Sequence, residues 1–340
     1  METKPVKSHQ HTAPKTYLRG FADTALNVST RRRTGAEVDL HITNVTVRKG
    51  FYNVRNSAGV LHDKVEDWFS HSIENPAGPV LERLRCGTPG TVAIVDAVVM
   101  ADFVAAQLYQ TATVRSYLDQ VDEYLGPLFL LLEVGKAHGR HLGDLVASER
   151  HWLHAARALD ELRDPDAYRA SQLRTMLREI DKMTTRLRTF HWRVTEAQSP
   201  CLITGDAPAI GLQPRRGAFA GVLPAGSPAY LPLTPTRLLV GREAPYGAGR
   251  DHALRPWLAR VVNSRIAAEA DDVVVKAPWQ RWPSHAWLAP ARPALPTPTL
   301  RRSRQAGARS GVEDQYPAVS SPAIRELLQI LEAVDSPPDN

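Results

Sequence analysis

The chain has 340 residues, of which 43% are hydrophobic and 23% are charged, so it has enough apolar material for a sizeable core and has the composition of a globular protein. No apolar run is long enough to span a bilayer, and two cysteines, Cys86 and Cys201, do not make a disulfide framework. The first ten residues are polar and lack the apolar core of a signal peptide. We therefore expect a reduced, cytoplasmic protein without a membrane span.

The positive charge of the chain is concentrated in one segment. The formal net charge is +6, and residues 290–312 carry five arginines and no acidic residue. Without that segment the chain is nearly neutral, so its overall charge is weak evidence that the folded part binds nucleic acid. The surrounding stretch is rich in Pro, Ser and Arg, and we predict that residues 289–320 form a disordered linker.

The first half of the chain predicts a few strands followed by many helices. Residues 1–10 are expected to form a flexible lead, with a helix after Pro14 and a loop at 27–35. Alternating apolar residues predict strands at 38–47 and 51–55, arranged as a β-hairpin. Apolar periodicity then predicts helices at 63–86, with a break at Asn75-Pro76, and at 91–109, 114–134, 142–162 and 166–191. The helix at 91–109 is apolar nearly all round and is therefore expected to be buried.

The second half returns to strands. Residues 201–204 predict a short buried strand, and Gly205 and Pro208 end it in a tight turn that presents Asp206. The remaining predicted elements are two short strands within 229–241, a helix at 255–270, a strand at 272–276 and an amphipathic helix at 321–335. Together these elements predict a single α+β domain over residues 11–288, predominantly helical with a small mixed β-sheet.

Five short motifs occur in an order that is found in a known family. They are His11-x-x-Pro14-x-x-Tyr17-Leu18-x-x-Phe21-Ala22, then Phe51-Tyr52 with a helix carrying Glu66 and Ile73-Glu74, then Gly205-Asp206-Ala207-Pro208, then Pro232-Leu233-Thr234-Pro235, and finally Asn263. From His11 to about Val275 the chain resembles the bacterial domain of unknown function family 4238. The resemblance implies a layout with a largely helical middle, but no established activity. At the turn, Gly205 and Ala207 replace the family's usual serine and asparagine, which weakens any mechanism that needs a hydroxyl or an amide there.

The resemblance singles out His11, Glu66, Glu74 and Asp206 as a candidate catalytic site, with Asn263 as an auxiliary residue. One imidazole and several carboxylates suit a hard divalent metal such as Mg²⁺ or Mn²⁺, so His11, Glu74 and Asp206 are the candidate metal ligands. A metal held there would activate water for hydrolysis.

Two other interpretations of the same residues remain open. In the first, His11 is a general base oriented by a carboxylate, and no metal takes part. In the second, the residues are structural: His11 caps the first helix, Asp206 accepts backbone N–H bonds in its own turn, and the two glutamates face solvent.

Two further groups of residues are candidate binding sites, the first for a metal ion and the second for phosphate. His138 and His141, and likewise His151 and His154, have the three-residue spacing of a helix face, so each pair is a candidate metal site, although exposed histidines are the simpler interpretation. The predicted helix at 166–191 carries basic residues at four-residue intervals on the side opposite its apolar stripe. These residues, which are candidate phosphate ligands or else a solvated face, are Arg174, Arg178, Lys182 and Arg186.

The leading functional hypothesis from the sequence is a metal-dependent hydrolase, similar to a nuclease or phosphodiesterase, that uses a His–carboxylate site. The alternative is a non-enzymatic binding module that engages nucleic acid or a protein partner, the latter through the helix at 321–335. The chain has neither a P-loop nor a Gly-x-Gly-x-x-Gly pattern, so a nucleotide cofactor is not indicated.

Overall fold

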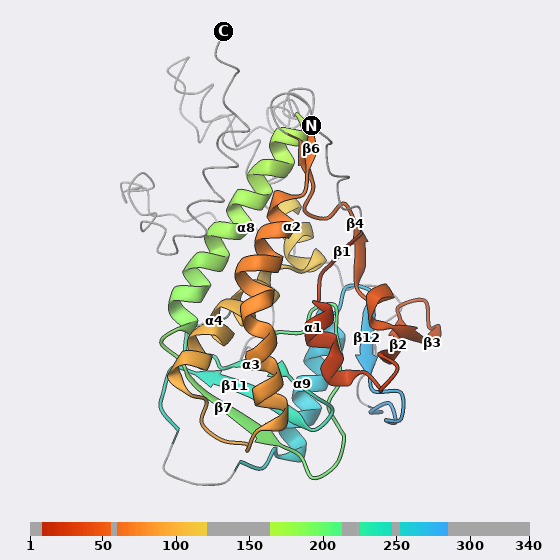
Figure 1. Cartoon of the computed structure of the whole chain (residues 1–340), viewed down its shortest axis with the longest axis vertical. Coiled ribbons are helices and arrows are strands. Elements are labelled where there is room, and N and C mark those ends of the chain that lie inside the picture. The colour runs from red at the N-terminus through yellow and green to blue at the C-terminus, as the bar shows by residue number, and fades with distance from the viewer. Residues whose placement is uncertain are drawn as a thin grey trace, which may run out of the picture.

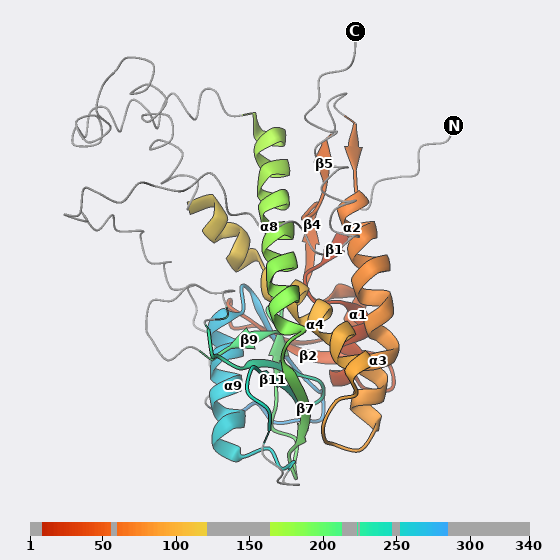
Figure 2. The same cartoon turned by 90° about the vertical axis from the view of Figure 1, so that its left-hand side faces the viewer.

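Strands and helices are interspersed along the chain, and most of the strands gather into two four-stranded sheets (Figures 1 and 2). The structure is a computed structural model that describes residues 9–55, 60–120, 164–212, 223, 225–246 and 252–284. About 45% of the described residues are helical and 22% lie in strands. None of the helices in these ranges combines the length and the apolar character that a membrane crossing requires.

Each four-stranded sheet combines distant parts of the chain. The first sheet has the order β7 (His191–Glu196), β11 (Arg237–Arg242), β10 (Ala229–Pro232) and β9 (Ile210–Gly211). The second has the order β3 (Glu37–His41), β2 (Asn27–Arg32), β12 (Val273–Lys276) and β8 (Thr204–Gly205). Because β8 and β9 are consecutive but belong to different sheets, the turn that contains Asp206 connects the two sheets.

Two small ribbons complete the strands. β1 (His9–His11) pairs with β4 (Val47–Lys49), and β5 (Val54–Arg55) pairs with β6 (Leu61–His62). All pairings between these named strands, in the ribbons and in the two sheets, are antiparallel.

The helices begin with α1 (Lys15–Leu18), which continues as a short 3₁₀ turn, η1 (Arg19–Phe21). A second 3₁₀ turn, η2 (Ile42–Asn44), separates β3 from β4. Then come α2 (Lys64–Trp68), the π-helix η3 (Phe69–Glu74) and α3 (Asn75–Cys86), which form one continuous rod. The remaining helices are α4 (Ile94–Tyr109), a helical segment at 112–120, α8 (Pro165–Leu187) and α9 (Pro256–Glu269).

Local sequence explains where the two clearest helices start. Asp164 caps α8, because its carboxylate accepts the backbone N–H groups of Asp166 and Ala167, and Pro165 occupies the first turn. Pro256 occupies the same position in α9, where its missing N–H costs nothing. The apolar stripe predicted for α8 is buried, and α4 packs against that helix. These helix predictions are therefore confirmed.

The sheet β7–β11–β10–β9 has a hydrophobic core on each face. Val194, Leu231 and Leu239 belong to the larger core, which includes the buried faces of α3, α4 and α8. Leu238 and Val240, from alternate positions of β11, belong to a smaller core with α9. Figure 2 shows α9 on one side of β11 and the helices α3 and α4 on the other. The sheet is therefore the middle layer of this part of the molecule.

The predicted fold class was wrong in its proportions. The chain is α+β, but it is a mixed arrangement with four sheets of two to four strands, not a predominantly helical body with one small mixed sheet. Several strands were missed, among them β1, β2 and β7. β2 was predicted as a loop because of its run of arginines, yet Arg31 pairs with Glu37 and Arg32 with Asp272 across the neighbouring strands. β7 was absorbed into the end of the preceding predicted helix.

The predicted hairpin of residues 38–47 and 51–55 was also wrong. β3 pairs with β2, β4 pairs with β1, and β5 pairs with β6, so no two of these segments pair with each other. The alternation in β3 did not mark a buried face, since its first three residues are exposed. The predicted helix at 142–162, the linker at 289–320 and the helix at 321–335 lie outside the described residues.

Candidate functional site

The helical rod that carries Glu66 and Glu74 contains a π-helical stretch, η3, between α2 and α3. Glu66, Ser70 and Glu74 follow one another at four-residue spacing. In an α-helix such a row drifts around the axis, because only 3.6 residues make a turn. A π turn is wider, so the drift is smaller and both glutamates stay on one side of the rod. Such turns are frequent at functional sites.

Tyr52 is buried, and both glutamates act on it. Burial raises the pKa of Tyr52 well above its usual value, the negative charges of Glu66 and Glu74 raise it further, and the positive charge of Arg115 opposes them. Among the described residues the Tyr52 hydroxyl has no hydrogen-bond partner. Tyr52 therefore stays protonated at neutral pH, and its O–H group is a free donor next to two carboxylates and a guanidinium.

Arg115, in the helical segment at 112–120, is held in place from one side only. Its Nη1 donates to the carbonyl of Phe51, and its guanidinium carbon lies 4.5 Å from the centroid of the Phe51 ring. Its Nη2 is buried and has no partner in the described part of the chain. Burial, with a smaller contribution from the charge of Arg169, lowers the pKa of Arg115 to about 10, so the side chain remains cationic at neutral pH.

The β1–β4 ribbon connects this cluster with Asp206, and it lies beside α2 in both views (Figures 1 and 2). Gln10 and Arg48 are partners across the ribbon. The Gln10 side chain donates to Asn53 Oδ1 at 2.6 Å and accepts the backbone N–H of Tyr52 at 2.6 Å. Arg48 Nη2 lies 3.7 Å from Asp206 Oδ2. One pair of strand residues thus joins the Tyr52 cluster to the turn between the sheets.

Asp206 is buried and holds the start of β12. Its two carboxylate oxygens accept the backbone N–H groups of Asp271 and Asp272, each at 2.9 Å. Burial raises the pKa of Asp206 to about 6, helped by the negative charge of Asp271 and opposed by the two backbone bonds and by Arg48. Asp206 does accept backbone N–H bonds, as the structural interpretation has it, but the donors lie after α9 and not in its own turn.

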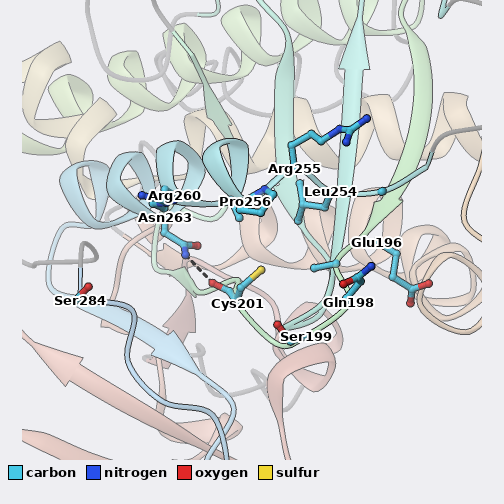
Figure 3. Close-up of a pocket in the computed structure, with 13 residues that line it drawn as sticks. Glu196, Gln198, Ser199, Cys201, Leu254, Arg255, Pro256, Arg260, Asn263 and Ser284 are labelled. Atoms are coloured by element: carbon cyan, nitrogen blue, oxygen red, sulfur yellow. Dashed lines mark hydrogen bonds between the residues drawn. The ribbon is translucent and has the colours of Figure 1, made fainter.

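Asn263 has a structural place as well. Its Nδ2 donates to the Cys201 carbonyl at 2.6 Å and its Oδ1 accepts the Ile203 N–H at 3.1 Å, so the amide pairs with the segment before β8 as a neighbouring strand would. Figure 3 shows this contact at the edge of a cavity of about 550 Å³. The Cys201 thiol also lines that cavity, and burial raises its pKa, so it is not activated as a nucleophile.

His11 is the last residue of β1, and its Nε2 donates to the Thr43 carbonyl at 3.2 Å. In the ranges that the structure describes, no group of three or more His, Cys, Asp or Glu residues is arranged to hold a metal ion. His11, Glu74 and Asp206 therefore do not fit Mg²⁺ or Mn²⁺ as a set. Their assignment as catalytic residues stays a prediction.

The basic row on α8 is partly engaged within the fold. Arg186 pairs with Glu243 at 2.7 Å, and Lys182 pairs with Glu179 at 2.6 Å. Arg174 donates to the Ala170 carbonyl at 3.4 Å, and Arg178 also has an interaction partner. Because these contacts already engage the basic side chains, less of their positive charge is available to bind phosphate. Phosphate binding by this row stays a prediction. His138, His141, His151 and His154 lie outside the described residues.

Sequence reasoning missed several members of the cluster. Gln10 falls in the predicted flexible lead, yet it is fully buried in β1. Tyr52 was noted only as part of a motif, and Arg115 and Arg48 carried no local signal. The one available signal was the four-residue spacing of Glu66, Ser70 and Glu74.

Comparisons with known proteins give one result. The model of the family DUF4238, which is described as a protein of unknown function, matches residues 9–278. No curated protein and no solved structure matches the chain.

Proposed function

Because the chain belongs to DUF4238, a family of proteins of unknown function, we propose its activity from the geometry: a hydrolase that cleaves phosphodiesters at Glu66, Glu74, Tyr52 and Arg115. The observation that carries the proposal is the pair of buried donors without partners, the Tyr52 hydroxyl and Arg115 Nη2, beside two glutamates. Buried polar groups are normally paired, so two such orphans within the described residues mark a place for a polar ligand.

A phosphodiester suits the cluster chemically. Guanidinium groups bind phosphate oxygens through short, charge-assisted hydrogen bonds, and Arg115 keeps its charge at neutral pH. The protonated Tyr52 hydroxyl supplies a second donor to a non-bridging oxygen. Both donors favour the extra negative charge that develops on those oxygens during attack.

The two glutamates divide the proton transfers. One carboxylate takes a proton from water as the water oxygen bonds to phosphorus, and the other carboxyl group gives a proton to the leaving oxygen as the old P–O bond breaks. The products are a phosphomonoester and an alcohol, and solvent restores the two protonation states. No step in this scheme uses a metal. His11, the last residue of β1, and Asp206, which lies near Arg48 of β4, then keep supporting roles.

The test is hydrolysis of bis-p-nitrophenyl phosphate and of labelled RNA and DNA oligonucleotides by the full chain, with Mg²⁺ and with EDTA. We expect E66Q and E74Q each to lower the rate by about 100-fold or more, the usual range for a lost general acid or base. E82Q, an exposed glutamate on α3 of the same rod, is the matched control and should keep its rate.

Full activity in both E66Q and E74Q would remove this site from the proposal. Activity that EDTA abolishes and Mg²⁺ restores would favour the metal-dependent mechanism instead. Binding of an oligonucleotide without turnover would support the alternative, a non-enzymatic binding module.

A further inference from the structure

Two arginines share one tyrosine ring on the sheet face that packs against α9. Arg193 of β7 has its guanidinium carbon 4.2 Å from the centroid of the Tyr246 ring, and Arg242 at the end of β11 has its own at 3.8 Å. The ring is held in place, because the Tyr246 hydroxyl donates to the Val240 carbonyl at 2.8 Å. We call Arg193, Tyr246 and Arg242 the arginine clamp.

The two positive charges of the clamp have no carboxylate partner in the part of the chain that the structure describes. The nearby acids along these strands are paired elsewhere: Glu196 with Arg237 at 2.8 Å, and Glu243 with Arg186 at 2.7 Å. Arg242 donates only to the Pro245 carbonyl, at 2.7 Å. Among the described residues, both charges are therefore uncompensated.

Tyr246 does not supply the missing negative charge. Burial raises the pKa of Tyr246 to about 12, although Arg242 and Arg193 both act to lower it, so the ring is neutral at physiological pH. In addition, the Nε atoms of Arg193 and Arg242 are buried without a partner in the described ranges. Two like charges over one neutral ring repel each other, and a bound anion would relieve both the repulsion and the unpaired donors.

We propose that the arginine clamp binds the phosphate group of a small molecule. Guanidinium groups present paired N–H donors that match the oxygens of phosphate, which makes arginine suited to this anion. Two cations are few for a polynucleotide surface, whose affinity grows with the number of phosphates that it neutralises. A small phosphate-bearing ligand is therefore the better match.

The test is a calorimetric titration of the full chain with inorganic phosphate and with pyrophosphate at low ionic strength. R193Q and R242Q should each weaken binding about tenfold, the effect of losing one charge-assisted hydrogen bond. The matched control is R19Q, which removes an exposed arginine on η1 and should bind as the wild type does.

Equal binding by R193Q, R242Q and the wild type would overturn the proposal, as would equal weakening in R19Q, which would show only an effect of net charge. Binding of a single-stranded oligonucleotide without binding of either small phosphate would also overturn it. If a glutamine variant does not fold, R193K and R242K replace it. They keep the charge but lose the paired donors, and must bind phosphate more weakly.

Discussion

Tyr17, Asp206 and Asn263 belong to the family motifs, and each makes two hydrogen bonds to parts of the chain that are distant in sequence. Tyr17 donates to the Pro232 carbonyl at 2.6 Å and accepts from the Thr204 hydroxyl at 2.7 Å. Asp206 and Asn263 hold the start of β12 and the segment before β8. These three residues therefore stabilise the fold. By contrast, the Tyr52 hydroxyl and Arg115 Nη2 are donors without a partner among the described residues.

The raised pKa of Asp206 predicts a pH dependence of stability. The pKa is about 6 in the folded chain against 3.8 for the ordinary group, so the folded state binds a proton that the unfolded state releases. The stabilisation is complete below about pH 4 and is lost as the pH rises through about 6. We expect the free energy of unfolding of the wild type, relative to D206N, to fall by about 3 kcal/mol between pH 4 and pH 7 in urea titrations.

A difference between wild type and D206N that stays constant over this range would contradict the pH prediction. D272N is the control for removing an acid from the segment that Asp206 contacts, because the Asp272 side chain is 35% exposed and pairs with Arg32 at the surface.

At the scale of elements, the sequence predicts helices whose apolar residues repeat locally. It misses strands that form only because neighbouring strands pair with them. The stripe of α8 and the proline at the start of α9 are local, and both helices form as predicted. β2 is different. All of its residues except Val28 are polar, and it is a strand because β3 and β12 pair with it on both sides. No pattern within β2 itself contains that information.

Removing the Asn263 amide should destabilise the segment before β8. N263A leaves the Cys201 carbonyl and the Ile203 N–H buried and unpaired, so we expect a loss of about 2 kcal/mol or more in unfolding free energy. Hydrogen exchange at the Ile203 amide should accelerate about tenfold or more. N27A is the control, since the half-buried Asn27 side chain makes no hydrogen bond to other described residues. Unchanged exchange at Ile203 in N263A would show that the amide does not hold this segment.

At the scale of the whole molecule, the larger core draws on both ends of the described chain, from Ala13 to Val275. The candidate site also combines residues that are distant in sequence. Gln10 reaches Tyr52 and Asn53 across more than 40 residues. Glu66 and Glu74 were predicted from the family resemblance, whose motif places both glutamates on one helix. Tyr52, Arg115 and Arg48 could not be predicted as partners, because only the tertiary fold brings them near the glutamates and Asp206.

Arg85 is where several of these distant parts meet. From α3, its guanidinium donates to the carbonyl of Thr16 at 3.0 Å, to that of Tyr17, and to that of Leu233 at 3.3 Å. It therefore ties α1 and the turn after β10 to the helical rod. Lysine keeps the charge but not the planar fan of donors. Because each lost charge-assisted bond is worth about 1.5–3 kcal/mol, R85K should lower the free energy of unfolding by about 3 kcal/mol.

The matched control is R83K on the same helix. Arg83 is 57% exposed and pairs with Asp96 at the surface, where solvent screens the ion pair and leaves it little effect on stability. Urea unfolding is followed by tryptophan fluorescence and by far-ultraviolet circular dichroism. For each protein the two probes should give the same unfolding curve. Of the two variants, only R85K should unfold at a clearly lower urea concentration than the wild type. Since one core joins both ends of the described part of the chain, the loss at Arg85 should destabilise that part as a unit. Two separate transitions in R85K would mean that α1 and α3 unfold independently of the sheets.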